Sequence, residues 1–218
     1  MSIATYAQLK TAIETWLARS GDTEISTNAS DLVTLAEARL NRELRLRVNW
    51  TNGALTGTIS SSTITLPSDF LEAQSLFLTT FGVQSKLGTF VAGERPIGTT
   101  NTVPMAWAID GANVQLDAPC DQAHTFIFRY LARFALSDSV TTNWLLTNHP
   151  DVYLFSALVE AEALVKDTSQ KWIALWKARA DEAIASINEI QARNTLVAKL
   201  GTDPAISTRG AFNIYTGL

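Results

Sequence analysis

Residues 148–167 read NHPDVYLFSALVEAEALVKD, and this stretch decides the fold of the chain. Asn148 is a candidate helix cap, and Pro150 and Asp151 are residue types favoured in the first turn of a helix. The side chains that follow are apolar nearly all round, which is typical of a helix that is central in a bundle or buried between subunits. The apolar stretch within it, Val152 to Val165, is shorter than the ~20 residues that a membrane span requires. We therefore expect a central bundle helix ending near Asp167 and no transmembrane helix.

Helical periodicity continues on both sides of this segment. Residues 169–198 form an amphipathic segment, which would be about 45 Å long at the rise of an α-helix. Its expected apolar face consists of Ile173, Trp176, Ala180, Ile184, Ile187 and Ile190. Near the start of the chain, Thr5 heads a capping-box pattern for a helix over residues 6–19. After a polar linker, Ser30 can cap another helix that should run to about Val48.

Between the helical regions the sequence changes to short runs rich in Thr, Ile, Val and Phe. Asp110-Gly111 separates two such runs and predicts a hairpin, because these residues tolerate the positive φ of tight turns. Residues 124–134 alternate as one long strand, and residues 58–66 contain two short strands around a serine-rich turn. Residues 82–104 hold four glycines and two prolines without a sustained period. We expect an extended loop or a protruding finger there.

The composition is that of a folded protein with an ample core, since 46% of the 218 residues are hydrophobic and 17% are charged. We predict an α+β fold: an α-helical bundle of two N-terminal and two long C-terminal helices, a central antiparallel β-rich insertion and an extended C-terminal tail. The bundle comprises residues 1–55 and 136–200, the insertion residues 56–135, and the tail residues 201–218. A lone Cys120 and the absence of a secretory pattern at the start favour a cytoplasmic origin.

The sequence offers no convincing catalytic, metal or cofactor site. One cysteine and two histidines without metal-ligand spacing argue against a metal site, and we interpret His124 and His149 as surface or capping residues. The acid that follows Cys120 would raise its thiol pKa rather than activate it. Glu160 and Glu162 point about 200° apart on a helix and cannot flank one substrate bond. We predict no enzymatic activity and no cofactor.

Positive charge is concentrated in one arginine cluster, made of Arg39, Arg42, Arg45 and Arg47. Arginines can bind phosphates or an acidic partner. Glu37 and Glu43 accompany the cluster and no aromatic residues are interleaved, which favours an acidic protein neighbour over DNA. The formal charge of −4 also predicts no general attraction to DNA or anionic lipid. Trp16, Trp172 and Trp176 lie on helical faces, where core positions are expected.

Three motifs surround the start of the central helix: Leu136-Ser137-Asp138, Thr142-Asn143-Trp144-Leu145-Leu146 and His149-Pro150-Asp151-Val152-Tyr153-Leu154. Together with the helix that follows, they resemble the C-terminal half of the head-to-tail adaptor, or connector, proteins of tailed bacteriophages. The similarity is clearest over residues 130–198. It implies that Asn143 and Trp144 fix a strand-to-helix turn. It also implies that Pro150 and Asp151, just before Tyr153, start the core helix.

In that family a small helical domain with a β-rich insertion and a long C-terminal helix pair forms a ring beneath the portal. The resemblance therefore implies a virion structural protein of the head–tail neck, assembled in the host cytoplasm. Its implied partners are the portal protein, tail-tube, nozzle or tail-completion proteins, and copies of itself in a twelvefold ring. Double-stranded DNA would pass through the lumen without sequence-specific binding. The resemblance assigns no active site and no membrane contact.

The tail beyond Gly201 has no amphipathic helical pattern, but it carries the apolar residues Phe212, Ile214 and Tyr215. We expect these side chains to anchor the tail on the portal or on an adjacent protomer, for example by strand addition. Alternatives to the adaptor are another tail-tube or tail-completion component, a phage-associated hydrolase and a regulatory domain. The last two lack a convincing catalytic cluster and a basic recognition face.

Overall fold

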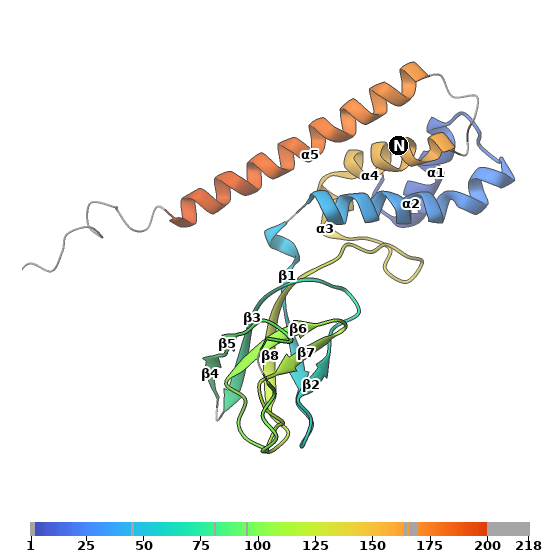
Figure 1. The fold of residues 1–218 in the computed structure, drawn as a ribbon. Helices are drawn as coiled ribbons and strands as arrows, with labels where there is room; N and C mark the ends of the chain where they lie inside the picture. The colour runs from blue at the N-terminus through green and yellow to red at the C-terminus, as the bar shows by residue number, and fades with distance from the viewer. Residues whose placement is uncertain are drawn as a thin grey trace, which may run out of the picture. The chain divides into compact units, whose positions relative to one another are not determined.

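The structure, a computed structural model, describes residues 3–44, 46–80, 82–94, 96–163, 165 and 170–199. The chain divides into two compact units. The helical unit takes the chain up to Leu46 and again from Ser137 onward, and the sheet unit takes residues 47–136 (Figure 1). The mixed α+β fold predicted from the sequence is confirmed. The sheet unit starts before residue 56, where the sequence pattern changes, because residues 50–56 already form a strand.

The helical unit is assembled around its most apolar helix. Its described helices are α1 (Tyr6–Trp16), α2 (Thr23–Glu43), α3 (Trp144–Asn148), α4 (Pro150–Glu160) and α5 (Gln170–Lys199). The central helix α4 packs against all four others, and its buried side chains include Val152, Tyr153 and Leu158. It ends earlier than the expected Asp167, because Ala161–Ala163 tighten into the 3-10 turn η2. Of the two long C-terminal helices that were expected, the described residues form one, α5.

The start of α4 differs in detail from the sequence expectation. Asn148 was expected to cap it, but Asn148 is the last residue of α3, and its side-chain amide donates to the carbonyl of Trp144. The cap position belongs to His149, whose side chain makes no capping hydrogen bond. Pro150 occupies the first turn as predicted, and Asp151 places a carboxylate there.

The long helix α5 buries the predicted face from Ile173 to Ile187, but Ile190 is 46% exposed. Helix α5 has 30 residues, whereas α4, which packs along it, has 11 (Figure 1). The C-terminal part of α5 therefore extends beyond α4, and Ile190 is not covered by it. Of the tryptophans expected in the core, Trp176 is buried, whereas Trp172 and Trp16 are 55% and 51% exposed.

Helix α1 begins at the predicted cap. The Thr5 hydroxyl accepts a hydrogen bond from the Gln8 N–H at 3.4 Å, and the Gln8 side chain accepts one from the Ala4 N–H at 2.8 Å. The helix stops at Trp16 rather than residue 19, and Ala18 adopts a positive φ of 54°. A left-handed residue of this kind cannot continue a right-handed helix.

The segment before Ser30, expected to be a polar linker, forms the first turns of helix α2. It begins at Thr23 rather than after Ser30, because the Asp22 carboxylate accepts a hydrogen bond from the Glu24 N–H at 2.9 Å. Ile25 and Ala29 are buried, so the first two turns pack in the core despite their polar sequence. The helix ends at Glu43, since the next residue is in an extended conformation. The expected extension to Val48 was wrong.

The sheet unit consists of two four-stranded sheets. Its strands are β1 (Trp50–Thr56), β2 (Thr63–Thr65), β3 (Phe70–Thr80), β4 (Val83–Lys86), β5 (Gly88–Thr89), β6 (Ala106–Asp110), β7 (Asn113–Leu116) and β8 (Thr125–Ala132). The first sheet has the order β1-β8-β3-β4 and is antiparallel. The second has the order β2-β7-β6-β5, in which β5 pairs with β6 in parallel. The insertion is therefore mixed and not wholly antiparallel.

Side chains of both sheets share one core, in which Trp107 of β6 meets Phe128 of β8 edge to face at 5.7 Å. The predicted hairpin is confirmed, since β6 and β7 pair across a tight turn where Gly111 has a φ of 57°. The expected loop over residues 82–104 instead contains β4 and β5. Its later part is tied to the second sheet, for example by the Gly98 N–H donating to the Asp117 carbonyl at 2.8 Å.

Candidate interaction surfaces

The turn into α3 is built by Asn143. Its side-chain oxygen accepts a hydrogen bond from the Leu146 N–H at 2.8 Å, which caps the helix. Trp144, half-buried, begins α3 and its ring lies 5.4 Å from that of His149. These contacts hold α3 and α4 together as a short helical corner.

The same asparagine belongs to a buried polar network. The Asn143 side-chain nitrogen donates to the Tyr153 hydroxyl at 2.6 Å, and that hydroxyl donates to a Glu37 carboxylate oxygen at 3.1 Å. Tyr153 is fully buried and Glu37 is 7% exposed. Burial and the negative charge of Glu37 raise the pKa of the Tyr153 hydroxyl, so the phenol stays protonated. The network joins α2, α4 and the turn before α3.

The sequence did not predict this network, because Glu37 was treated there only as an acid that accompanies the arginine cluster. A signal was present, because Glu37 lies four residues after Val33 and three before Leu40, both buried on the core face of α2. A carboxylate at such a position needs a buried partner.

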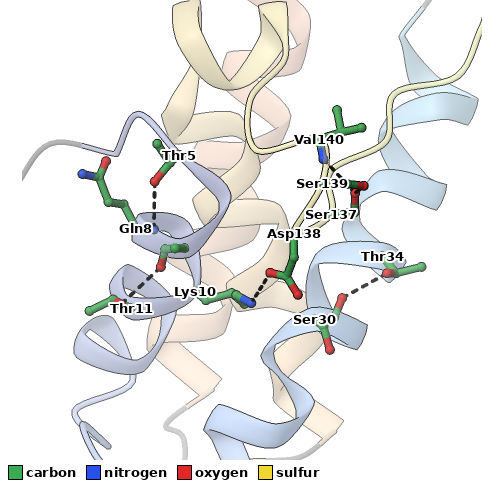
Figure 2. A network of polar contacts seen from close by, with 11 residues as sticks. Thr5, Gln8, Lys10, Thr11, Ser30, Thr34, Ser137, Asp138, Ser139 and Val140 are labelled. Atoms are coloured by element: carbon green, nitrogen blue, oxygen red, sulfur yellow. Dashed lines mark hydrogen bonds and ion pairs between the residues drawn. The ribbon is translucent and has the colours of Figure 1, made fainter.

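The segment after the sheet unit is fastened to α1. The Thr141 carbonyl accepts a hydrogen bond from the Tyr6 N–H at 2.7 Å, and Lys10 forms an ion pair with Asp138 at 3.1 Å. Figure 2 shows Lys10 reaching from α1 to Asp138, beside the turn in which the Ser137 hydroxyl accepts from the Val140 N–H. The segment that starts at Ser137 is thus bonded to α1, the first helix of the chain.

The arginine cluster does not form one described patch. Arg39 of α2 pairs with Glu43 at 3.0 Å and with Asp181 of α5 at 2.6 Å, so it connects two helices of its own unit. Arg42 is exposed on α2. Arg45 lies outside the described residues, and only the backbone of Arg47, which starts the 3-10 turn η1 (Arg47–Asn49), is described. The tail residues Phe212, Ile214 and Tyr215 also lie outside the described part.

His124 and Cys120, two of the residues considered for chemistry, are both buried. His124 is buried and its ring nitrogen lies 2.7 Å from an Asp121 oxygen, which corrects the expected surface position. Burial, and then the charge of Asp121, raise the pKa of the Cys120 thiol as predicted. In the part of the chain that the structure describes, no group of three or more His, Cys, Asp or Glu side chains could hold a metal ion. No described helix meets the length and hydropathy needed to cross a bilayer.

Exposed apolar side chains gather on one flank of the helical unit. The Trp16 ring meets the Phe155 ring of α4 edge to face at 5.7 Å, and the Arg179 guanidinium of α5 lies 6.0 Å from the same ring. Leu175 and Trp172, 43% and 55% exposed, precede Arg179 by one and two turns on the same helix face. We call the set Trp16, Phe155, Trp172, Leu175 and Arg179 the α5 strip.

A shallow depression lies beside the α5 strip. It has a volume of about 290 Å³ and is lined by Asp151, Phe155, Arg179, Glu182, Ala183 and Ser186. Its wall combines an aromatic ring with exposed charges of both signs. This lining suits a protein side chain more than a small-molecule substrate, because no converging catalytic groups are present among its residues.

The comparisons with known proteins identify one family. No curated protein sequence matches the chain. The sequence model of the SU10 adaptor protein family matches residues 4–200, which covers both the helical and the sheet unit. The chain therefore belongs to the SU10 adaptor protein family and is a phage adaptor.

Proposed function

We propose that this adaptor is a virion structural protein that forms a ring below the portal, joins the capsid to the tail and extends the DNA channel. It is assembled in the host cytoplasm and contributes no chemistry of its own. The observation that carries the proposal is the family match over residues 4–200. The α5 strip supports it, because half-exposed tryptophans are uncommon on an isolated monomer and typical of protein interfaces.

The experiment is assembly with the portal protein encoded in the same genome. Native mass spectrometry and negative-stain imaging are applied to the adaptor alone, the portal alone and their mixture. We expect a ring on one face of the portal and a mass increase by a fixed number of 23.7 kDa subunits. A portal that stays unchanged while a tail component captures the adaptor would replace the proposal with a tail-completion role.

We further propose that the tail contacts the portal through Phe212, Ile214 and Tyr215. A chain ending at residue 204 should keep the helical content of the full chain and lose portal attachment. The matched control is the full chain with alanine at the exposed position Val140, which changes apolar surface outside the tail. Unchanged attachment of the shortened chain would remove the tail from the proposal and leave the ring proposal intact.

The ring would let DNA pass without holding it. A channel wall that neutralised many phosphates would bind DNA through counterion release, and the formal charge of −4 per chain opposes this. We expect the assembled ring to show no salt-sensitive binding of linear double-stranded DNA in a filter or fluorescence assay. Tight binding at low salt that weakens steeply with added salt would contradict this part of the proposal.

A further inference from the structure

The first sheet of the sheet unit has two open edges. Strand β1 forms one edge and β4 the other, with β8 and β3 between them. Directly after β1, the Gly57 N–H donates to the His124 carbonyl at 2.9 Å, so the odd-numbered residues of β1 bond to β8. The backbone N–H and C=O groups of Asn52 and Ala54 therefore point away from the sheet. They make no hydrogen bond within the described part of the chain.

The same alternation leaves backbone groups free on β4. The Leu87 N–H donates to the Leu76 carbonyl at 2.9 Å, so Gln84 and Lys86 turn their backbone groups away from β3. Among the described residues these groups have no hydrogen-bond partner. A row of unpaired N–H and C=O groups at a sheet edge is a template for pairing with another chain.

Strand β1 lacks the features that keep edge strands apart. Natural edge strands are commonly protected by charged side chains, prolines or bulges. The seven residues of β1, WTNGALT, include neither a charge nor a proline, and their register with β8 is regular. Strand β4 carries one charge, that of Lys86. A seven-residue edge without protection favours a second strand that covers it in the assembled protein.

The occupant that fits both edges is a second copy of this chain. Strands β1, β8, β3 and β4 alternate in direction, so β1 of a second copy placed beside β4 continues the antiparallel pattern. Such pairing joins two different patches and places each copy beside the next, as a ring requires. We propose that β4 of one copy pairs with β1 of the neighbouring copy. This inference rests on the proposed ring and names the strands through which its subunits meet.

Apolar side chains at the two edges select the register of this pairing. Leu55 of β1, Phe126 of β8, Leu78 of β3 and Ser85 of β4 lie in one row on the core face of the sheet. Val83, two residues before Ser85, shares this face and is 65% exposed. Leu55 is only partly buried. Val83 of one copy placed opposite Leu55 of the next removes both side chains from water.

This register also pairs the free backbone groups. It brings Gln84 opposite Ala54 and Lys86 opposite Asn52, so the outward N–H and C=O groups of the two edges bond to each other. Lys86 then approaches Arg129, the exposed residue that faces Asn52 from β8. Both cations lie on the solvent side of the sheet, where salt screens their repulsion.

The short length of β4 limits the strength of the contact. Its four residues span about 13 Å. A stable interface buries about 800 Å² on each partner, which a contact of this length does not reach. Two free chains therefore stay apart, and the strands pair when the portal holds the copies side by side at high effective concentration.

Disulfide trapping tests the pairing. One chain carries Ala54→Cys and another Gln84→Cys, both at exposed positions, while the native Cys120 is buried. Opposite residues that exchange hydrogen bonds have Cα atoms about 5.5 Å apart, within the range that a disulfide spans. The variants are mixed on the portal and oxidised, and the interchain disulfide is quantified by non-reducing electrophoresis. The control replaces Gln84→Cys with Met105→Cys, which is 71% exposed and outside both edge strands.

We expect the Ala54 and Gln84 variants to form roughly tenfold more mixed disulfide on the portal than the control pair. A mixed yield equal to the control would overturn the proposal. An Ala54→Cys disulfide between identical chains that exceeds the mixed product would overturn it as well, because β1 would then pair with itself. Portal co-sedimentation is measured in the same samples. A ring without the mixed disulfide rejects this contact and keeps the proposed function, whereas a loss of all portal binding rejects both.

Proline at the outward positions gives an independent measurement. Ala54→Pro removes an N–H that points away from β8, so β1 keeps its bonds to β8 and loses a donor to the next copy. We expect fewer complete rings in negative-stain images, whereas the control Ala54→Ser, which keeps the N–H, should assemble as the unchanged chain does. Gln84→Pro removes the matching donor on β4 and should have the same effect. Unchanged ring occupancy in both proline variants would show that these edges do not meet.

Discussion

Replacing Tyr153 with phenylalanine removes one oxygen from the core of the helical unit. The hydroxyl accepts from Asn143 at 2.6 Å and donates to Glu37 at 3.1 Å, and it is fully buried. A neutral hydrogen bond contributes about 0.5–1.5 kcal/mol and one to a charged group about 1.5–3 kcal/mol. We therefore expect Tyr153→Phe to lower the free energy of unfolding of the helical unit by roughly 2–4 kcal/mol.

The assay is urea unfolding followed by far-UV circular dichroism in the helical band. The matched control is Tyr6→Phe, because Tyr6 is also buried in the helical unit and its hydroxyl makes no hydrogen bond within the described part of the chain. We expect the control to change the free energy of unfolding by less than about 1 kcal/mol. Equal losses in the two variants would refute the argument that the network, rather than general packing, stabilises α2 against α4.

Tyr153→Phe should also change how the free energy of unfolding depends on pH in alkaline solution. Burial raises the pKa of Tyr153 above its ordinary value of 10.0, so the folded state retains the phenol proton after the unfolded state has lost it. This contribution to stability is complete below pH 10 and declines as the pH rises further. Above pH 10 the wild-type free energy of unfolding should fall more steeply than that of Tyr153→Phe, by about 1.4 kcal/mol per pH unit. Parallel pH profiles would show that Tyr153 ionises as readily in the folded chain.

Three further predictions concern packing, thiol reactivity and a surface ion pair. Gly57→Ala should destabilise the sheet unit by about 1–3 kcal/mol in urea unfolding, because its Cβ would lie 2.8 Å from the Cys120 Sγ, whereas Gly88→Ala, with 3.7 Å to its nearest neighbour, should change little. Cys120 should react with Ellman's reagent only after denaturation, since it is buried and its pKa is raised; prompt reaction of the native chain would count against that burial. Lys10→Ala should change the melting temperature little, because its partner Asp138 is 88% exposed and such pairs contribute less than about 1 kcal/mol.

The elements that the sequence predicted best are those whose signal is local. The hairpin at Gly111 depends on a turn of two residues, and the cap at Thr5 on the next three positions. Helix α5 repeats its apolar residues at helical spacing from Ile173 to Ile190, so the periodicity is unambiguous. In each case the information lies within a few turns of the chain.

The sequence predictions were wrong where contacts between residues far apart in the chain decide which of two local structures forms. Asp22 and Ser30 are both residue types that cap helices, and the burial of Ile25 and Ala29 in the core favours a start after Asp22. Glu37 finds its partner 116 residues away, so its neighbours in the sequence could not reveal that it is buried. The parallel pairing of β5 with β6 likewise depends on a connection of some length rather than on a turn motif.

The amphipathic pattern of α5 could not show which of its apolar residues are buried and which remain exposed. The exposed ones are the residues that support a role in binding a partner. Trp172 and Trp176 are four residues apart, yet one is 55% exposed and the other 6% exposed. The core face consists of the residues that meet α4, and an apolar residue beside that face, such as Trp172, keeps about half of its surface in water. Large apolar side chains in water carry a cost in solubility. The grouping of Trp172 with Trp16 and Leu175 on one flank, rather than scattered over the surface, favours a partner protein there.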